Sequence, residues 1–359
     1  MGVGTLAGMT ANPVRLDRLA TWMATASGAA ELQIVGMYKL AGGAIQQNWH
    51  IEILANGGVF AGAGSVVLRT DAPSSVGESH SRAQEFALLL TAHAAGVKVA
   101  TPRLLCSDDT IIGTPFFIMD YCSGQGQARR ITRDPTLADF GSRLAGELGR
   151  EMARIHAVTT SAAELSFLPL DGDNAAVAQL ADSRAALDGL AEGQPVIEYA
   201  LNWLEDRLDG WQRTAPRRLC HRDFRSGNFL VEAGRLTALL DWEFAGWSDP
   251  AEDIGWLCAR CWRFGNDDLV VGGIAGFATF KKAYEAESGT TIDTAAVVYW
   301  QLVAEIRWAI IDLQQQERAL FGGETSLELA LSGYLAPEME SNMLALISAM
   351  ESGAKEGPI

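Results

Sequence analysis

Three residues carry side-chain oxygens of the kind that ligate a hard cation. Asp223 and Asn228 lie five positions apart in the segment LCHRDFRSGNFLV, and Asp241 follows the apolar pair Leu239–Leu240. Carboxylate and amide oxygens are ligands that suit Mg²⁺. Taken singly, each residue is more often a turn or cap residue. Their order predicts a loop, a strand, a turn, a second strand and a second loop.

This segment resembles the H-x-D-x-x-x-x-N catalytic loop and the downstream metal-binding Asp of the protein-kinase-like superfamily. The form is that of aminoglycoside phosphotransferases and choline-kinase-like enzymes. Three further segments fit this family in order and spacing, namely REMARIH at 150–156, DP at 249–250 and DIGW at 253–256. The segments VVLRT at 66–70 and GTPFFIMDY at 113–121 resemble more narrowly a bacterial branch related to the phosphotransferase-like domain of certain acyl-CoA dehydrogenases. The resemblance extends from about residue 32 to about residue 320.

The resemblance implies a role for each of the three residues. Asp223 is expected to receive or orient the acceptor hydroxyl, while Asn228 and Asp241 hold Mg²⁺ across the phosphates of ATP. Because little proton transfer is needed early in a loose transition state, alignment by Asp223 should matter more than a raised pKa. His221 and Arg222 are expected to support the loop and to take no part in the chemistry.

Further nucleotide-binding positions are implied in the first third of the chain. Gly42, Gly43 and Ala44 occupy the place of the loop that covers the nucleotide, where glycine lets backbone amides approach phosphates closely. This loop lacks G-x-G-x-x-G, so a plain hairpin turn would look the same. Met119 and Tyr121, at the strand that enters the hinge, are expected to line the adenine pocket, although an apolar strand is more commonly core.

Arg69 departs from the family's pattern. Superfamily members often carry Lys on the third strand, where it contacts the nucleotide phosphates, whereas this chain has Arg69. A guanidinium can bridge phosphate and carboxylate, so phosphate binding is retained in principle with a different geometry. Glu85, on the next helix, is the expected partner of Arg69, and the alternative is that Glu85 is a solvated helix residue.

The elements that must position these residues form two dissimilar halves. Strand-like and helical runs come first, with strands at 32–40, 49–54, 65–68 and 114–121 and helices at 12–23 and 81–95. Apolar residues then recur at helical spacing over 140–155 and 303–313, which predicts long buried helices. We therefore predict an α+β, bilobal protein-kinase-like fold. Its nucleotide-binding lobe, with a small antiparallel sheet, covers 1–121, and a helical lobe with the catalytic loop and the acceptor pocket covers 122–359.

The composition excludes several classes of protein. The 359 residues are 48% hydrophobic and carry a formal net charge of −16, which is typical of a globular protein and argues against a nucleic-acid partner. No charge-free run of about 18 apolar residues and no basic leader region is present, so we expect no membrane partner and a cytoplasmic location. Five scattered cysteines favour reduced thiols, and the pair Cys258 and Cys261 lacks the further ligands of a zinc site.

Together these inferences favour an ATP- and Mg²⁺-dependent kinase that phosphorylates a hydroxyl of a small molecule. Aminoglycosides, other hydroxylated antibiotics, choline-like alcohols and hydroxyacyl thioesters are the candidate acceptors, with a tilt toward an acyl or metabolic compound. The alternative is a catalytically silent kinase fold that binds nucleotide or serves as a scaffold, which Arg69 keeps open and the three oxygen-bearing residues oppose. A protein kinase is disfavoured because DWE at 241–243 replaces D-F-G and no A-P-E segment follows at the expected place.

Aromatic residues are concentrated in the helical half, which should supply the acceptor pocket over 258–346. Candidates to line an apolar or stacking surface there are Trp256, Trp262, Phe264, Trp300 and Trp308. Tryptophan at helical spacing is usually core, and we expect most of these residues to be core.

Overall fold

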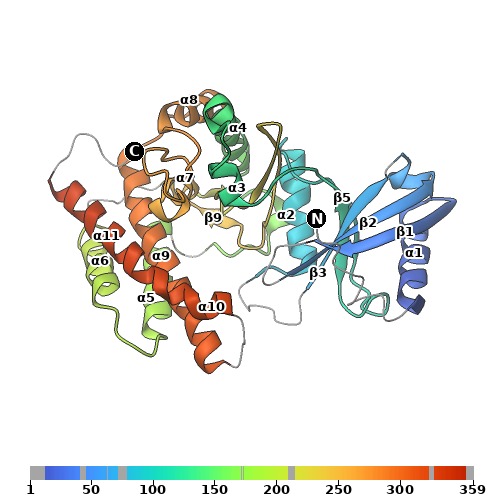
Figure 1. Cartoon of the computed structure of the whole chain (residues 1–359), viewed down its shortest axis with the longest axis horizontal. Helices are drawn as coiled ribbons and strands as arrows, with labels where there is room; N and C mark the ends of the chain where they lie inside the picture. The colour runs from blue at the N-terminus through green and yellow to red at the C-terminus, as the bar shows by residue number, and fades with distance from the viewer. Residues whose placement is uncertain are drawn as a thin grey trace. The chain divides into compact units, whose positions relative to one another are not determined.

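The chain forms two compact units in a computed structural model (Figure 1). Unit 1 comprises 1–123 and 237–244, and unit 2 comprises 124–236 and 245–359. The short segment that carries Asp241 thus belongs to the N-terminal unit. The structure describes residues 13–40, 46–62, 64–71, 79–170, 172, 174–208, 215–322 and 327–352.

Unit 1 is built on a five-stranded antiparallel sheet with the strand order β1-β2-β3-β5-β4. Its elements are α1 (Pro13–Ser27), β1 (Glu31–Lys39), β2 (Gln46–Asn56), η1 (Gly58–Phe60), β3 (Ser65–Asp71), α2 (Arg82–Ala94), β4 (Pro102–Cys106) and β5 (Phe116–Asp120). The predicted strands and both helices are confirmed, and the turn after β2 uses positive φ at Gly57 and Gly58, of 84° and 68°. The edge strand β4 was not predicted, because it is short and begins with proline.

The two helices of unit 1 cover opposite faces of the sheet. Successive side chains of a strand point to opposite faces. Phe116 meets Trp22 of α1 with ring centroids 5.0 Å apart, whereas Phe117 meets Phe86 of α2 at 5.8 Å. Arg69 of β3 pairs with Phe117 across the sheet, so its side chain lies on the face that α2 covers. The register of the sheet therefore brings Arg69 to α2.

Unit 2 is mainly helical. Its helices are α3 (Ala128–Thr132), α4 (Leu137–Ala157), η2 (Ala163–Leu165), α5 (Ala175–Asp188), α6 (Pro195–Glu205), α7 (Pro250–Cys258), η4 (Arg260–Trp262), α8 (Phe277–Ser288), α9 (Thr294–Phe321), α10 (Leu327–Ser332), η5 (Gly333–Leu335) and α11 (Ala336–Glu351). The predicted helices at 140–155 and 303–313 are parts of α4 and α9. Its short strands β6 (Arg218–Cys220) and β9 (Gly246–Ser248) pair with each other. The short strand β7 (Phe229–Glu232) pairs with β8 (Arg235–Leu239), of which residues 237–239 belong to unit 1.

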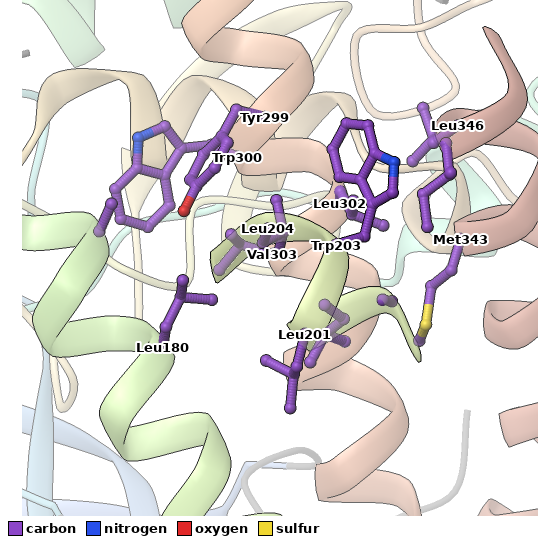
Figure 2. Packing of buried hydrophobic residues seen from close by; sticks show 14 of the residues in the cluster. Leu180, Leu201, Trp203, Leu204, Tyr299, Trp300, Leu302, Val303, Met343 and Leu346 are labelled. Atoms are coloured by element: carbon purple, nitrogen blue, oxygen red, sulfur yellow. The ribbon is translucent and has the colours of Figure 1, made fainter. Parts of the chain in front are cut away.

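The long helix α9 is the centre of the core of unit 2. Figure 2 shows side chains of α5, α6, α9 and α11 packed together, with Leu180, Trp203, Trp300 and Met343 among them. An 18-residue window of α9 has a mean hydropathy of 1.2, which matches a membrane span by length and composition, but 72% of that window is buried inside the protein. Burial by its neighbours accounts for the apolar character of α9.

Close packing of α7 on α9 depends on one glycine. A Cβ atom at Gly255 would lie 2.6 Å from Cβ of Trp300, so a larger residue would force the helices apart. Trp256 and Asp253, on either side of Gly255, are held in the same helix. The fit between α7 and α9 therefore sets the position of both side chains, which matter for the site below.

Candidate active site

The loop of unit 2 that carries Asp223 connects β6 to β7 and is held by Asp253 of α7. The backbone nitrogens of His221 and Arg222 donate to the two carboxylate oxygens of Asp253, each at 2.7 Å. Asp253 is fully buried, and Nε2 of His156 lies 3.1 Å from one of its oxygens. Burial raises the pKa of Asp253, but the hydrogen bonds and charges of His156 and His221 outweigh it, so the net pKa is lowered. An ionised carboxylate thus holds the loop in place.

The side chains of His221 and Arg222 have partners that fit the predicted supporting role. Nδ1 of His221 accepts a hydrogen bond from the backbone nitrogen of Asp223 at 3.3 Å. Arg222, in the left-handed region with φ of 61°, donates through Nε to Glu252 at 3.1 Å and through Nη2 to Gln179 at 2.9 Å. Neither contact uses the carboxylate of Asp223.

The carboxylate of Asp223 is oriented by three donors within unit 2. Nε of Arg225 and Nε1 of Trp256 donate to Oδ1, at 2.9 and 3.0 Å, and the amide nitrogen of Asn228 donates to Oδ2 in a short hydrogen bond. The side chain of Asp223 is 14% exposed. Such a carboxylate is fixed in direction while part of it stays accessible, which suits the alignment of a hydroxyl group.

Asn228 is arranged so that its carbonyl oxygen is turned away from Asp223. Its amide nitrogen donates both to the backbone oxygen of Asp223, at 2.9 Å, and to the carboxylate. An amide whose nitrogen faces a carboxylate must direct its oxygen elsewhere. That oxygen is of the kind that Mg²⁺ prefers, so Asn228 fits the metal role that the resemblance implies.

In unit 1 the expected contact between Arg69 and Glu85 is present. Nε of Arg69 lies 2.7 Å from Oε1 of Glu85, and Nη1 lies 3.2 Å from Oδ1 of Asp241 and 3.3 Å from Oδ1 of Asn48. Arg69 is buried, and within the described chain its Nη2 has no hydrogen-bond partner. Burial lowers the pKa of Arg69, but the negative charges of Glu85 and Asp241 outweigh this effect. The net pKa is raised, so the group stays charged. An unpartnered buried N–H of a charged arginine fits a phosphate oxygen.

A second arginine, which the sequence did not reveal, completes this ion cluster. Nη1 of Arg82 forms a close ion pair with Oε2 of Glu85, while Nε lies 2.9 Å from Asp71 and Nη2 donates to the backbone oxygen of His80 at 2.9 Å. Arg82 is buried one turn before Glu85. Each carboxylate oxygen of Glu85 therefore pairs with an arginine, and the alternative that Glu85 is a solvated helix residue is wrong.

Two further acidic residues of unit 1, Asp241 and Glu243, lie close to Arg69 and Glu85. Asp241 adopts a positive φ of 58°, and its side chain is 34% exposed. Such a backbone conformation is uncommon for a residue with a side chain and is concentrated at functional sites. Burial, together with Asp241 and Glu85, raises the pKa of Glu243 to about 7 against the opposing effect of Arg69. Glu243 was not singled out from the sequence, because its setting depends on charged side chains of β3 and α2, which are distant in the sequence.

The remaining predicted positions are placed as follows. Gly42, Gly43 and Ala44 lie outside the described residues. Met119 is half-buried in β5. Tyr121, just after β5, is 42% exposed, and its ring centroid lies 4.6 Å from that of His50 in an edge-to-face arrangement. The adenine role of Met119 and Tyr121 stays a prediction.

The cysteines and histidines provide a structural network and no second reactive centre that the described residues reveal. All five cysteines are free thiols, as expected. His156, Cys220 and Asp253 approach one another closely enough to hold a metal, but His156 is engaged by Asp253 and by Tyr284, whose hydroxyl lies 2.8 Å from Nδ1. Burial raises the pKa of Cys258 to about 12, so little of the metal-binding thiolate forms at neutral pH.

Comparisons of sequence identify relatives in larger proteins. The chain is 31% identical over 186 residues to acyl-CoA dehydrogenase family member 10 of Mus musculus, covering 50% of this chain and 17% of the relative. It is 26% identical over 196 residues to acyl-CoA dehydrogenase family member 11 of Homo sapiens, covering 52% of this chain and 24% of the relative. This chain thus spans less than a quarter of the length of these two proteins.

Comparisons of structure find the same fold in phosphotransferases. A protein of Ralstonia eutropha JMP134, provisionally assigned as an aminoglycoside phosphotransferase, matches with a TM-score of 0.72 and 20% identity over 92% of this chain and 98% of its own. Spectinomycin phosphotransferase, in complex with ADP and spectinomycin, matches with a TM-score of 0.62 and 12% identity over 93% of this chain and 99% of its own. A choline/ethanolamine kinase family protein of Mesorhizobium loti matches with a TM-score of 0.56 and 18% identity over 93% of this chain and 99% of its own.

These similarities show a kinase-like fold. The model of the phosphotransferase enzyme family matches residues 38–289, a range that includes Arg69, Asp223, Asn228 and Asp241. The match covers more than half of the chain. The chain therefore belongs to the phosphotransferase enzyme family.

Proposed function

We propose that the protein transfers the γ-phosphate of ATP to a hydroxyl group of a small molecule in a Mg²⁺-dependent reaction. The observation that carries this proposal is the setting of Asp223. Its carboxylate is fixed by Arg225, Asn228 and Trp256 and remains 14% exposed, so a hydroxyl can reach it in one orientation. Family membership and the nucleotides bound in structural neighbours support the choice of a nucleotide as donor.

The residues present fit a nucleotide and its metal. The buried, unpartnered Nη2 of Arg69 suits a phosphate oxygen, and Asp241 and the carbonyl oxygen of Asn228 supply ligands of the kind that Mg²⁺ takes. When bound, Mg²⁺ neutralises the charge that develops on the phosphates. Glu85 and Asp241 hold the guanidinium of Arg69 in one orientation.

Asp223 acts on the acceptor in this scheme. The hydroxyl oxygen of the acceptor attacks the γ-phosphorus while the bond from that phosphorus to the bridging oxygen of ADP breaks. The hydroxyl proton passes to the carboxylate of Asp223 late in the step, as expected for a loose transition state. The donors on Asp223 keep the accepting oxygen in line with the hydroxyl.

The proposal is tested by measuring phosphate transfer and nucleotide binding together. The purified chain is incubated with Mg²⁺ and γ-labelled ATP and a panel of hydroxy acids, hydroxyacyl thioesters, choline and aminoglycosides, and ATP affinity is measured by calorimetry with and without Mg²⁺. We expect Mg²⁺-dependent binding and a phosphorylated product. Tight nucleotide binding with no transfer to any compound would instead favour the silent nucleotide-binding module.

A further inference from the structure

The guanidinium of Arg225 is held beside the catalytic carboxylate with most of its donors unused. Nε donates to Oδ1 of Asp223 at 2.9 Å, and the guanidinium carbon lies 4.6 Å from the ring centroid of Trp262. Among the residues that the structure describes, Nη1 and Nη2 of Arg225 have no hydrogen-bond partner, and the side chain is 25% exposed. Arginine has five N–H donors, so four remain for a ligand.

A layer of tryptophan fixes the direction of this guanidinium. The rings of Trp256 and Trp262 lie 5.5 Å apart, and those of Trp262 and Trp308 lie 4.6 Å apart. Trp256 and Trp262 are buried, at 3% and 4% exposure, and Nε1 of Trp256 donates to Asp223. An arginine that stacks on a buried ring and bonds through Nε loses little further freedom when an anion binds to its outer nitrogens. Most of these tryptophans are core residues, as expected, and the ring of Trp262 packs against the guanidinium of Arg225.

A second arginine adds positive charge next to the same loop. The guanidinium carbon of Arg307 lies 4.9 Å from the ring centroid of Trp256, and its Nη1 donates to the backbone oxygen of Arg222 at 3.1 Å. Its side chain is 20% exposed. Arg225 and Arg307 thus each stack on a tryptophan of one layer and contact the catalytic loop within one residue of Asp223 or at Asp223 itself.

The carboxylates Glu252 and Glu305 near this layer are already engaged within the protein, so they leave no free partner for a cationic ligand. Oε1 of Glu252 lies 3.1 Å from Nε of Arg222 and 3.5 Å from Nη1 of Arg307. Glu305 is fully buried and accepts bonds from two backbone amides and from Asn342. Burial raises the pKa of Glu305 to about 7. A polycationic acceptor would need ionised, accessible carboxylates, and Glu252 and Glu305 supply none.

We propose that Arg225 binds an anionic group of the acceptor, so that the substrates are hydroxyl compounds carrying a carboxylate or a phosphate. This inference rests on the proposed function and specifies its acceptor class. An anion on the outer nitrogens of Arg225 would place a hydroxyl a few carbons away next to Asp223, because Nε of the same guanidinium donates to Oδ1 of that carboxylate. Two sources supply this chemistry, namely the carboxylate of a short hydroxy acid and the phosphates of a coenzyme A thioester.

The experiment compares acceptors that differ only in charge. Wild type, Arg225→Gln and Arg225→Lys are assayed for phosphate transfer to β-hydroxybutyrate and γ-hydroxybutyrate, to their neutral amides and to their coenzyme A thioesters, with choline and kanamycin as cationic acceptors. Arg260→Gln is the matched control, because Arg260 is exposed, pairs with Asp267 and belongs to the same 3₁₀-helix as Trp262. Binding of each compound is also measured by quenching of tryptophan fluorescence, which needs no turnover.

We expect kcat/KM for the better anionic acceptor to exceed that of the amide by about 10-fold or more, as for one charged hydrogen bond. Arg225→Gln should remove this ratio, Arg225→Lys should retain part of it, and Arg260→Gln should leave it unchanged. Preference for the free acids over their thioesters identifies the carboxylate as the anion, and the reverse identifies the phosphates.

Several results would overturn the inference. They are equal rates for acids and amides, a preference for choline or kanamycin, an equal loss for both acceptor types in Arg225→Gln, and a complete lack of anion binding by fluorescence. The second and third of these leave the proposed function intact. Conversely, anion binding that depends on Arg225 without any ATP binding would contradict the proposed function and retain the anion site.

Discussion

Two buried carboxylates, Glu85 in unit 1 and Asp253 in unit 2, are both surrounded by hydrogen-bond donors. They differ in whether the residues that donate to them keep an unused N–H group. Asp253 is bonded by a histidine and by two backbone amides of the catalytic loop, all of them fixed parts of the fold. Glu85 is bonded by two arginines, and Arg69 keeps a buried nitrogen without a partner among the described residues. A closed set of hydrogen bonds shapes a site, whereas an unfilled donor can bind a ligand.

Removing the carboxylate of Asp253 should have the largest effect on stability. Asp253→Ala leaves the backbone amides of His221 and Arg222 buried without an acceptor, which should lower the free energy of unfolding by about 3–5 kcal/mol. Asp253→Asn, which keeps one oxygen, should lose less. Urea unfolding of both variants measures this difference. A loss of less than about 1 kcal/mol in Asp253→Ala would show that the loop is held by other contacts.

Changing Arg69 should affect nucleotide binding more than stability, if its free nitrogen binds phosphate. Arg69→Gln should weaken ATP affinity by roughly 10–100-fold, the value of a charged hydrogen bond, and Arg69→Lys should lose less because the charge is kept. Arg82→Lys is the control, since every side-chain nitrogen of Arg82 lies beside an oxygen of the protein. Calorimetry that finds equal losses in the Arg69 and Arg82 variants would assign both arginines to structure alone.

The smallest effect is expected at Asp312, whose stability contribution should depend on pH. Asp312 is 1% exposed, and burial raises its pKa to about 7. An acid whose pKa is raised by folding keeps its proton to a higher pH in the folded state than in the unfolded state. The free energy of unfolding therefore falls as pH rises from about 4 to about 7. Asp312→Asn should remove that decline and be more stable than wild type at pH 8 by on the order of 1–3 kcal/mol.

The matched control for this prediction is Asp268→Asn, because Asp268 is exposed in the same unit. Urea unfolding at pH 5 and pH 8 provides the measurement. Identical pH dependence in wild type and Asp312→Asn would mean that folding does not raise the pKa of Asp312.

Local patterns were sufficient to predict most of the fold. Alternation and turn glycines marked β1, β2, β3 and β5, and apolar spacing marked α4 and α9. The strand β4 was missed because Pro102 opens it and no alternation follows. The assignment of 237–244 to unit 1 was also missed, since it depends on packing between segments distant in the sequence.

The candidate site was predictable where a motif fixes a residue and not where packing does. The resemblance supplied Asp223, Asn228, Asp241 and the Arg69–Glu85 contact. Arg82 could not be found this way, because its partners are Asp71 of β3, Glu85 of α2 and the backbone oxygen of His80, which precedes α2. The stacking of Arg225 on Trp262 depends on how η4 packs against the loop, which no local pattern expresses.

The most direct test of the account is the behaviour of Asp223→Asn, measured as kcat for phosphate transfer to the best acceptor and as Kd for Mg²⁺-ATP. Asparagine keeps the size of the side chain and an oxygen for Arg225 and Trp256 but cannot take a proton. We predict a kcat lower by about 10²-fold or more with an unchanged Kd. Turnover equal to that of wild type would contradict the central claim that Asp223 aligns and deprotonates the acceptor hydroxyl.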